Sequence, residues 1–142
     1  MNHEPFVIER IYDAPVERVW QAITNRDQMK EWYFDIAEFK PEVGFEFSFT
    51  GGDENNTYLH LCKVTEVINQ KKLTYTWKYK GQNEATYVTW ELFNEDGKTR
   101  VKLTHEGLER IEIYGAPFVR ENFAEGWNHI VGIALKDFTE QQ

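Results

Sequence analysis

The residues best suited to chemistry in this sequence are two histidines, His60 and His105, and one cysteine, Cys62. A thiol acts as a nucleophile only when a positioned base activates it, and the nearest histidine, His60, lies two residues away on the same predicted strand. Cys62 and His60 lie side by side on one predicted strand face, and a triad would also need a third group that orients the base. We therefore interpret Cys62 as a small buried residue and predict no catalytic residue.

The histidines do not predict a metal centre either. His60 and His105 lie on different predicted strands, whereas His3 and His129 lie elsewhere in the chain. Zinc sites are recognised by closely spaced Cys and His ligands, and this sequence has no such spacing. We expect neither a metal nor another cofactor.

Aromatic residues make up 15% of the chain and recur at every second position in several segments. A period of two predicts strands with one buried and one exposed face. Asn94-Glu95-Asp96-Gly97 predicts a hairpin, because Asp-Gly supplies the positive φ angles of a tight turn. Consecutive hairpins predict an antiparallel meander. The predicted inward residues are Phe45, Phe47, Phe49, Tyr58, His60, Leu73, Tyr75, Trp77, Tyr79, Val88, Trp90, Val101, Leu103 and His105.

Two short helices are expected after a first strand over residues 6–12. Pro15 suits the first turn of a helix, and the apolar residues from Val16 to Ile23 follow helical spacing. A second short helix is predicted from about Asp27, which we assign as its cap. These helices precede the meander.

The last helix is predicted from about Phe118. Roughly twenty residues span about 30 Å, enough to cross the sheet. Gly126 and Gly132 lie inside this helix, where each costs about 1 kcal/mol relative to alanine, so we expect something large beside the backbone. The predicted apolar stripe is Val119, Phe123, Trp127, Ile130, Val131, Ala134, Leu135 and Phe138.

Length and charge exclude several classes of protein. A chain of 142 residues predicts one domain, residues 1–142. Its net charge of −8 provides no basic surface, so nucleic acid is not an expected partner. No apolar stretch reaches the about 18 residues of a membrane span, and the first residues lack the order of a signal peptide. We expect a cytoplasmic protein, and one cysteine fits a reducing compartment.

Seven motifs together carry a family resemblance: DAPVERVWQAIT, EWY, VGFEFSF, KVTEVINQKKLTYTW, VTWELF, TRVKLTHEG and EGWNHIVGIAL. In this order, from about Phe6 to Phe138, they resemble the activator of heat-shock-protein-90 ATPase homologue family. Cys62 occupies a position where that family often has glycine. The resemblance implies an α+β helix-grip fold (START-like, birch-pollen-allergen-like). In this fold a curved antiparallel sheet wraps around a long C-terminal helix, and two short helices follow the first strand.

The resemblance also implies a ligand cavity between the sheet and the last helix. Pattern alone favours a packed core, whereas a curved sheet, a single covering helix and helix glycines favour an open volume for an apolar, aromatic or lipid-like molecule. The predicted ligand-binding residues are Phe45, Phe47, Phe49, Tyr58, His60, Tyr75, Trp77, Val88, Trp90, His105, Phe123, Gly126, Trp127 and Ile130.

Two other functions compete with ligand binding. A cyclase or hydrolase would use the same cavity but needs a converging acid and base. A chaperone ATPase activator is implied by the family name alone, and we rank it last because the separate chaperone-binding domain is not expected in this chain.

Three further features stay open at this level. Arg10 shares a predicted strand face with Ile8 and Tyr12, and it either contacts a ligand or pairs with a carboxylate such as Glu106. The apolar connection Leu108 to Pro117 is a lid, an extra strand or a self-association patch. Asp53 and Glu54 are most simply solvated loop residues.

Overall fold

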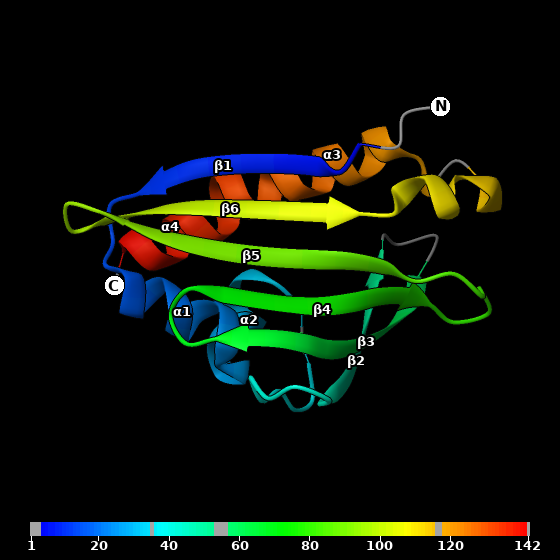
Figure 1. Ribbon diagram of the computed structural model, residues 1–142, viewed down its shortest axis with the longest axis horizontal. Coiled ribbons are helices and arrows are strands. Elements are labelled where there is room, and N and C mark those ends of the chain that lie inside the picture. Colours follow the sequence, from blue (N-terminus) through cyan, green and yellow to red (C-terminus); the bar gives the residue numbers. More distant parts are fainter. Residues whose placement is uncertain (1–3, 35, 53–56, 116–117, 142) are drawn as a thin grey trace.

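A curved antiparallel sheet of six strands forms one layer of the molecule, and the helices cover its inner face (Figure 1). The computed structural model describes residues 4–34, 36–52, 57–115 and 118–141. The strand order is β1-β6-β5-β4-β3-β2. The strands are β1 (Phe6–Tyr12), β2 (Glu46–Gly52), β3 (Thr57–Ile68), β4 (Lys72–Tyr79), β5 (Thr86–Glu95) and β6 (Lys98–Glu106). The predicted helix-grip fold is confirmed.

The alternation that predicted the strands matches their burial. On β4 the residues Leu73, Tyr75, Trp77 and Tyr79 are buried, and on β6 the residues Val101, Leu103 and His105 are fully buried. The hairpin between β5 and β6 turns at Asp96 and Gly97, whose φ angles of 55° and 89° are both positive. The predicted antiparallel meander is therefore confirmed, together with its Asp96-Gly97 hairpin.

Helices α1 (Val16–Thr24) and α2 (Arg26–Trp32) follow β1, as expected. Pro15 immediately precedes α1. The cap of α2 was predicted wrongly: Asn25, not Asp27, accepts a hydrogen bond from the backbone N–H of Gln28 at 3.1 Å. Asp27 lies inside the first turn, where its charge still favours the positive end of the helix dipole.

The last helix contains a turn that the sequence analysis did not predict. Between α3 (Arg120–His129) and α4 (Leu135–Glu140), residues Ile130–Ala134 form a π-helical turn, in which the N–H of Leu135 donates to the carbonyl of Ile130. The buried residues recur every four positions: Phe123, Trp127, Val131, Leu135 and Thr139.

This four-residue spacing gives a physical reason for the π turn. An α-helix has 3.6 residues per turn, so a side chain four positions on is rotated by about 40°. Such a stripe would drift off the sheet over four steps. The wider π turn offsets that drift, and both halves of the helix keep their large side chains on the sheet.

The connection before the last helix forms two 3₁₀ turns, Leu108–Arg110 and Glu112–Tyr114, so residues 108–115 are not an extra strand. Leu108 and Ile111 are buried, whereas Ile113 is 81% exposed. The connection is thus anchored by two apolar side chains. Ala116 and Pro117 lie outside the described residues.

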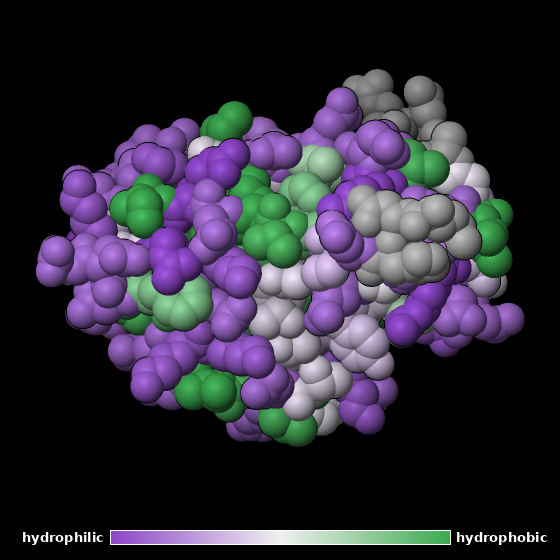
Figure 2. Space-filling view, turned by 45° about the horizontal axis from the view of Figure 1, so that its top comes forward, coloured by the Kyte–Doolittle hydropathy of each residue, from purple (hydrophilic) through white to green (hydrophobic). Residues whose placement is uncertain are grey.

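The outer surface carries separate hydrophobic groups among hydrophilic ones (Figure 2). The large exposed apolar residues include Val7 and Ile11 on β1, Leu61 on β3 and Tyr87 on β5. Within the described part of the chain, no helix is long and apolar enough to cross a membrane.

Candidate functional site

A pocket of about 250 Å³ lies between the inner face of the sheet and the last helix. Its described lining is mostly aromatic and is uncharged at neutral pH. The lining residues are Phe34, Gly51, Tyr58, His60, Trp77, Tyr79, Asn122, Phe123, Gly126, Trp127 and Ile130.

The register of two strands creates the sheet side of this pocket. His60 on β3 lies opposite Tyr79 on β4, and Trp77 lies two residues earlier on the same face of β4. The ring centroid of His60 is 4.8 Å from that of Trp77 and 4.7 Å from that of Tyr79. These rings form a continuous aromatic wall.

Helix α3 supplies the opposite wall. Phe123 and Trp127 are one turn apart and both are buried, whereas Gly126 lies between them without a side chain. A Cβ atom built on Gly126 would meet no atom within 4 Å. The glycine therefore leaves open space where most residues would place a side chain.

The Tyr79 hydroxyl accepts one hydrogen bond and also has a hydrogen that it can donate. The indole Nε1–H of Trp77 donates to the Tyr79 hydroxyl oxygen at 2.9 Å, and an indole nitrogen can only donate. The Tyr79 hydroxyl is thus an acceptor here, and its own hydrogen has no acceptor in the described part of the chain. Burial raises the pKa of Tyr79 well above its usual value, so the hydroxyl stays protonated.

His60 is a neutral pocket residue. Its Nδ1 lies 2.9 Å from the carbonyl oxygen of Tyr58, and a carbonyl only accepts, so Nδ1 carries the proton. Burial lowers the pKa of His60 to about 4, although the backbone carbonyls of Tyr58 and Phe49 oppose this shift. At neutral pH the imidazole therefore brings no charge to the pocket.

His105 belongs to a hydrogen-bonded chain behind the pocket. Trp127 Nε1–H donates to His105 Nδ1 at 3.0 Å, so Nε2 carries the proton and donates to Thr86 Oγ1 at 2.7 Å. The Thr86 hydroxyl in turn donates to the carbonyl of Trp77 at 3.0 Å. Burial lowers the pKa of His105 to about 3. This chain of bonds fixes the Trp127 indole relative to the sheet.

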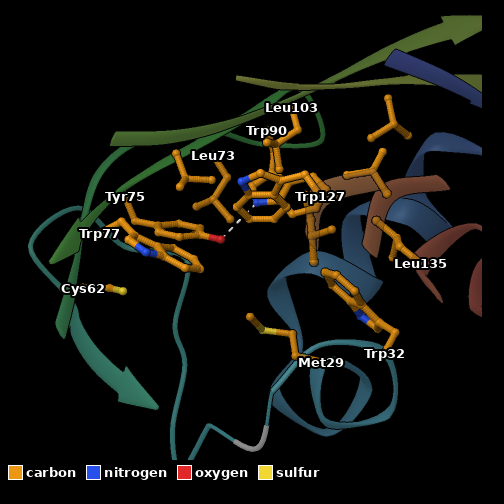
Figure 3. Close-up of a cluster of buried hydrophobic side chains, with 14 of the residues drawn as sticks. Met29, Trp32, Cys62, Leu73, Tyr75, Trp77, Trp90, Leu103, Trp127 and Leu135 are labelled. Carbon is orange, nitrogen blue, oxygen red and sulfur yellow. Dashed lines mark hydrogen bonds between the residues drawn. The ribbon is translucent and has the colours of Figure 1, made fainter. Parts of the chain in front are cut away.

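The neighbouring part of the interior is filled. Trp90 Nε1–H donates to the Tyr75 hydroxyl at 3.1 Å, as the dashed line in Figure 3 shows, and the Tyr33 hydroxyl lies 2.8 Å from the same oxygen. The ring of Trp32 packs edge-on against Trp90, with centroids 5.8 Å apart. We call Tyr33, Tyr75, Trp32 and Trp90 the closed core.

The structure divides the predicted site residues into two groups. Seven of them line the pocket: Tyr58, His60, Trp77, Phe123, Gly126, Trp127 and Ile130. The others are buried or partly buried in the apolar interior and do not line it: Phe45, Phe47, Phe49, Tyr75, Val88, Trp90 and His105.

Phe34, Gly51, Tyr79 and Asn122 line the pocket but were not among the predicted ligand-binding residues, although Tyr79 was predicted to face inward. Phe34 lies in a stretch without helical or strand periodicity, so no pattern pointed to it. A Cβ on Gly51 would lie only 2.8 Å from Phe34 Cε1, which shows that this glycine makes room for the ring. Gly51, near the end of β2, was the one feature of the sequence that could have indicated a large side chain packed against the backbone.

Arg10 and Cys62 lie outside the pocket. Arg10 is exposed and donates to the Glu9 carbonyl at 2.7 Å and to Asn128 Oδ1 at 3.3 Å. It does not pair with Glu106, because the register places Arg10 opposite Val101, near the other end of β6. Cys62 is buried, as predicted, and burial raises the pKa of its thiol. Asp53 and Glu54 lie outside the described residues.

A larger hollow of about 520 Å³ lies on the outer side of β2, β3 and β4. It is lined largely by outward-facing side chains, which include Glu46, Ser48, Lys63 and Lys78. Charged side chains of this kind are usually solvated. The inner pocket is therefore the better candidate site for an apolar molecule.

The comparison with family models gives one match. The model described as "Activator of Hsp90 ATPase homolog 1-like protein" matches residues 13–140. No curated protein sequence matches the chain.

Many solved structures share this fold. DynU16, a protein in the dynemicin biosynthetic locus, has 20% identity and a TM-score of 0.80 over 98% of this chain, which spans only 48% of DynU16. BH1534 from Bacillus halodurans has 26% identity and a TM-score of 0.73, with 96% of this chain and 99% of BH1534 covered. MLL2253 from Mesorhizobium loti has 26% identity and a TM-score of 0.70, with 96% of this chain and 94% of MLL2253 covered.

Proposed function

The chain belongs to the family of Activator of Hsp90 ATPase homolog 1-like proteins, and from this premise we propose that it binds a small, largely apolar molecule between the sheet and the last helix. The single observation that carries the proposal is the mostly aromatic pocket, in which Gly126 leaves the helix side open. Ligand pockets in proteins are mostly apolar concavities with a few oriented polar groups, and this pocket has that composition.

The chemistry of the lining supports an aromatic or cyclic ligand. Trp77 and Trp127 have ring centroids 5.6 Å apart, and the two rings are tilted by 57° relative to each other. Such rings offer large apolar faces, on which a flat molecule can pack edge-on or offset. The volume of about 250 Å³ suits a ligand portion of a few fused rings or an equivalent short chain.

A thermal-shift screen of flat aromatic compounds, sterols and fatty acids tests this function. A ligand at about 100 times its Kd stabilises the protein by roughly 2.7 kcal/mol, which raises the Tm measurably. Failure of every compound class to raise the Tm would contradict the proposal.

Gly126→Leu locates the site of any compound that binds. The new side chain has open space and fills the pocket from the helix side, so we expect a folded protein that has lost binding. Gly132→Ala is the matched control, because Gly132 lies in the same helix but does not line the pocket. Unchanged affinity in Gly126→Leu would place the ligand elsewhere.

The cyclase or hydrolase hypothesis has less support. It requires an acid and a base that converge on the ligand, and His60 and the tyrosines are the described pocket residues that can titrate. His60 is neutral at pH 7 and donates its proton to a backbone carbonyl. The family's description names an ATPase activator. We predict that this chain does not stimulate the ATPase activity of such a chaperone.

A further inference from the structure

The polar groups of the pocket define which ligands it can hold. The described lining residues with polar side-chain groups, besides the two tryptophans, are Tyr58, Tyr79, Asn122 and His60, whose ring is neutral. No described lining residue carries a charge at neutral pH. A ligand that enters must therefore do without an ionic partner.

An anionic ligand would meet a penalty here. Removing a carboxylate from water without a partner costs several kcal/mol, and aromatic walls do not compensate for it. On α3, the exposed acidic residues Glu121 and Glu125 directly precede the lining residues Asn122 and Gly126. The net charge of the chain, −8, adds to the repulsion of anions.

The hydroxyl hydrogen of Tyr79 marks where a ligand acceptor would bind. The Tyr79 side chain is only 7% exposed, its hydroxyl oxygen already accepts from Trp77, and its hydrogen has no acceptor in the described part of the chain. A buried donor without an acceptor is unfavourable, and a ligand carbonyl oxygen would satisfy it.

We infer that the pocket selects neutral cyclic molecules that carry a carbonyl oxygen, and that the Tyr79 hydroxyl donates to that oxygen. The inference rests on the proposed function, since it concerns the same pocket. It assigns Tyr79 a role in specificity rather than in general affinity, because the aromatic walls bind hydrocarbon and ketone alike.

Three probes of similar size and shape test this selectivity: 2-acetonaphthone, 2-ethylnaphthalene and 2-naphthoate. Titrations at pH 7.5, followed by the ¹⁵N–¹H signals of the tryptophan side chains, report binding beside Trp77 and Trp127. We expect the ketone to bind about fivefold more tightly than the hydrocarbon, which is the usual net value of one hydrogen bond. The carboxylate should bind at least about a hundredfold more weakly than the ketone.

Tyr79→Phe identifies the donor, and Tyr87→Phe on the outer face is the matched control. In Tyr79→Phe the two neutral probes should bind with equal affinity, whereas Tyr87→Phe should keep the preference for the ketone. Equal affinity of the two neutral probes in the unmodified protein, or tighter binding of the carboxylate, would overturn the inference while leaving the proposed function intact. If none of the probes perturbs Trp77 or Trp127, and the screen above also fails, the proposed function itself falls.

Discussion

Tyr75 and Tyr79 lie four residues apart on the same face of β4, yet their hydroxyls have different surroundings. The Tyr75 hydroxyl has two partners, Trp90 and Tyr33, inside the closed core. Among the described residues the Tyr79 hydroxyl has one partner, Trp77, and Tyr79 lines the pocket. One strand thus contributes both to a filled region and to an unfilled one, and strand alternation alone does not distinguish them.

The difference comes from what covers the strand. Over Tyr75, the end of α2 and the residue after it bring Trp32 and Tyr33 into the interior. Over Tyr79, helix α3 presents Gly126 between two aromatic residues. Whether an inward-facing aromatic residue is part of the packed core or lines the pocket therefore depends on the covering element.

The largest expected effect comes from emptying the closed core. Trp90→Ala removes a side chain that is 1% exposed and leaves the Tyr75 hydroxyl without its indole donor, so we expect a loss of about 3–5 kcal/mol in the free energy of unfolding. Phe123→Ala at the pocket is the comparison, and it should cost less than Trp90→Ala, because Phe123 lines a pocket and loss of its ring enlarges a space that already exists. Urea unfolding at pH 7 measures both. Equal losses would show that the pocket is packed as tightly as the core.

Acid should destabilise the protein through its two buried histidines. The pKa is lowered to about 4 for His60 and to about 3 for His105, so the folded state favours the neutral rings and the unfolded chain binds more protons below pH 6.5. The stabilisation is fully present above that pH and is lost as the pH falls towards the folded-state pKa values. Each histidine contributes a slope of up to about 1.4 kcal/mol per pH unit.

Urea unfolding between pH 7 and pH 5 measures this slope. His105→Gln and His60→Gln should each reduce it, and comparison with the unmodified protein cancels the contribution of the carboxylates. His105 is fully buried, so its variant should reduce the slope at least as much as the His60 variant. An unchanged slope in both variants would show that the histidines are hydrated in the folded state.

Much of the sheet could be predicted because its signals are local. Alternation along β4, β5 and β6 identified the inward residues, and Asp96-Gly97 identified the hairpin. Each signal depends on the dihedral angles or spacing of a few neighbouring residues. Seven pocket residues were named from the sequence, but only Trp77 lies on these three strands, and four of the others lie on the last helix.

The remaining features depend on contacts between distant segments. Phe34 reaches the pocket from a stretch without periodicity, and it fits there only because Gly51, on β2, has no side chain. The four-residue spacing from Phe123 to Thr139 was visible in the sequence, but its conversion into a π turn depends on packing against the sheet. Pocket residues and core residues shared one pattern, so their separation could not be predicted.

The smallest of the expected effects concerns the π turn that joins the two halves of the last helix. The Tyr12 hydroxyl donates to the carbonyl of Val131, in the π turn, at 2.5 Å. This turn joins α3, which contributes Trp127 to the pocket, to α4, which contains Leu135. Tyr12→Phe leaves that buried carbonyl with one fewer donor, so we expect a loss of about 1–2 kcal/mol in the free energy of unfolding. Tyr87→Phe, an exposed tyrosine on the outer face, should change it by less than about 0.5 kcal/mol.

The position of the Trp127 indole separates two consequences of this change. If the Tyr12 bond holds the π turn, its loss allows the helix to tighten towards α geometry, and residues on one side rotate relative to the other. The indole N–H signal of Trp127, which depends on the bond to His105, should then shift in Tyr12→Phe but not in Tyr87→Phe. A destabilised variant with an unshifted Trp127 signal would show that packing alone maintains the turn, and that the pocket wall does not depend on Tyr12.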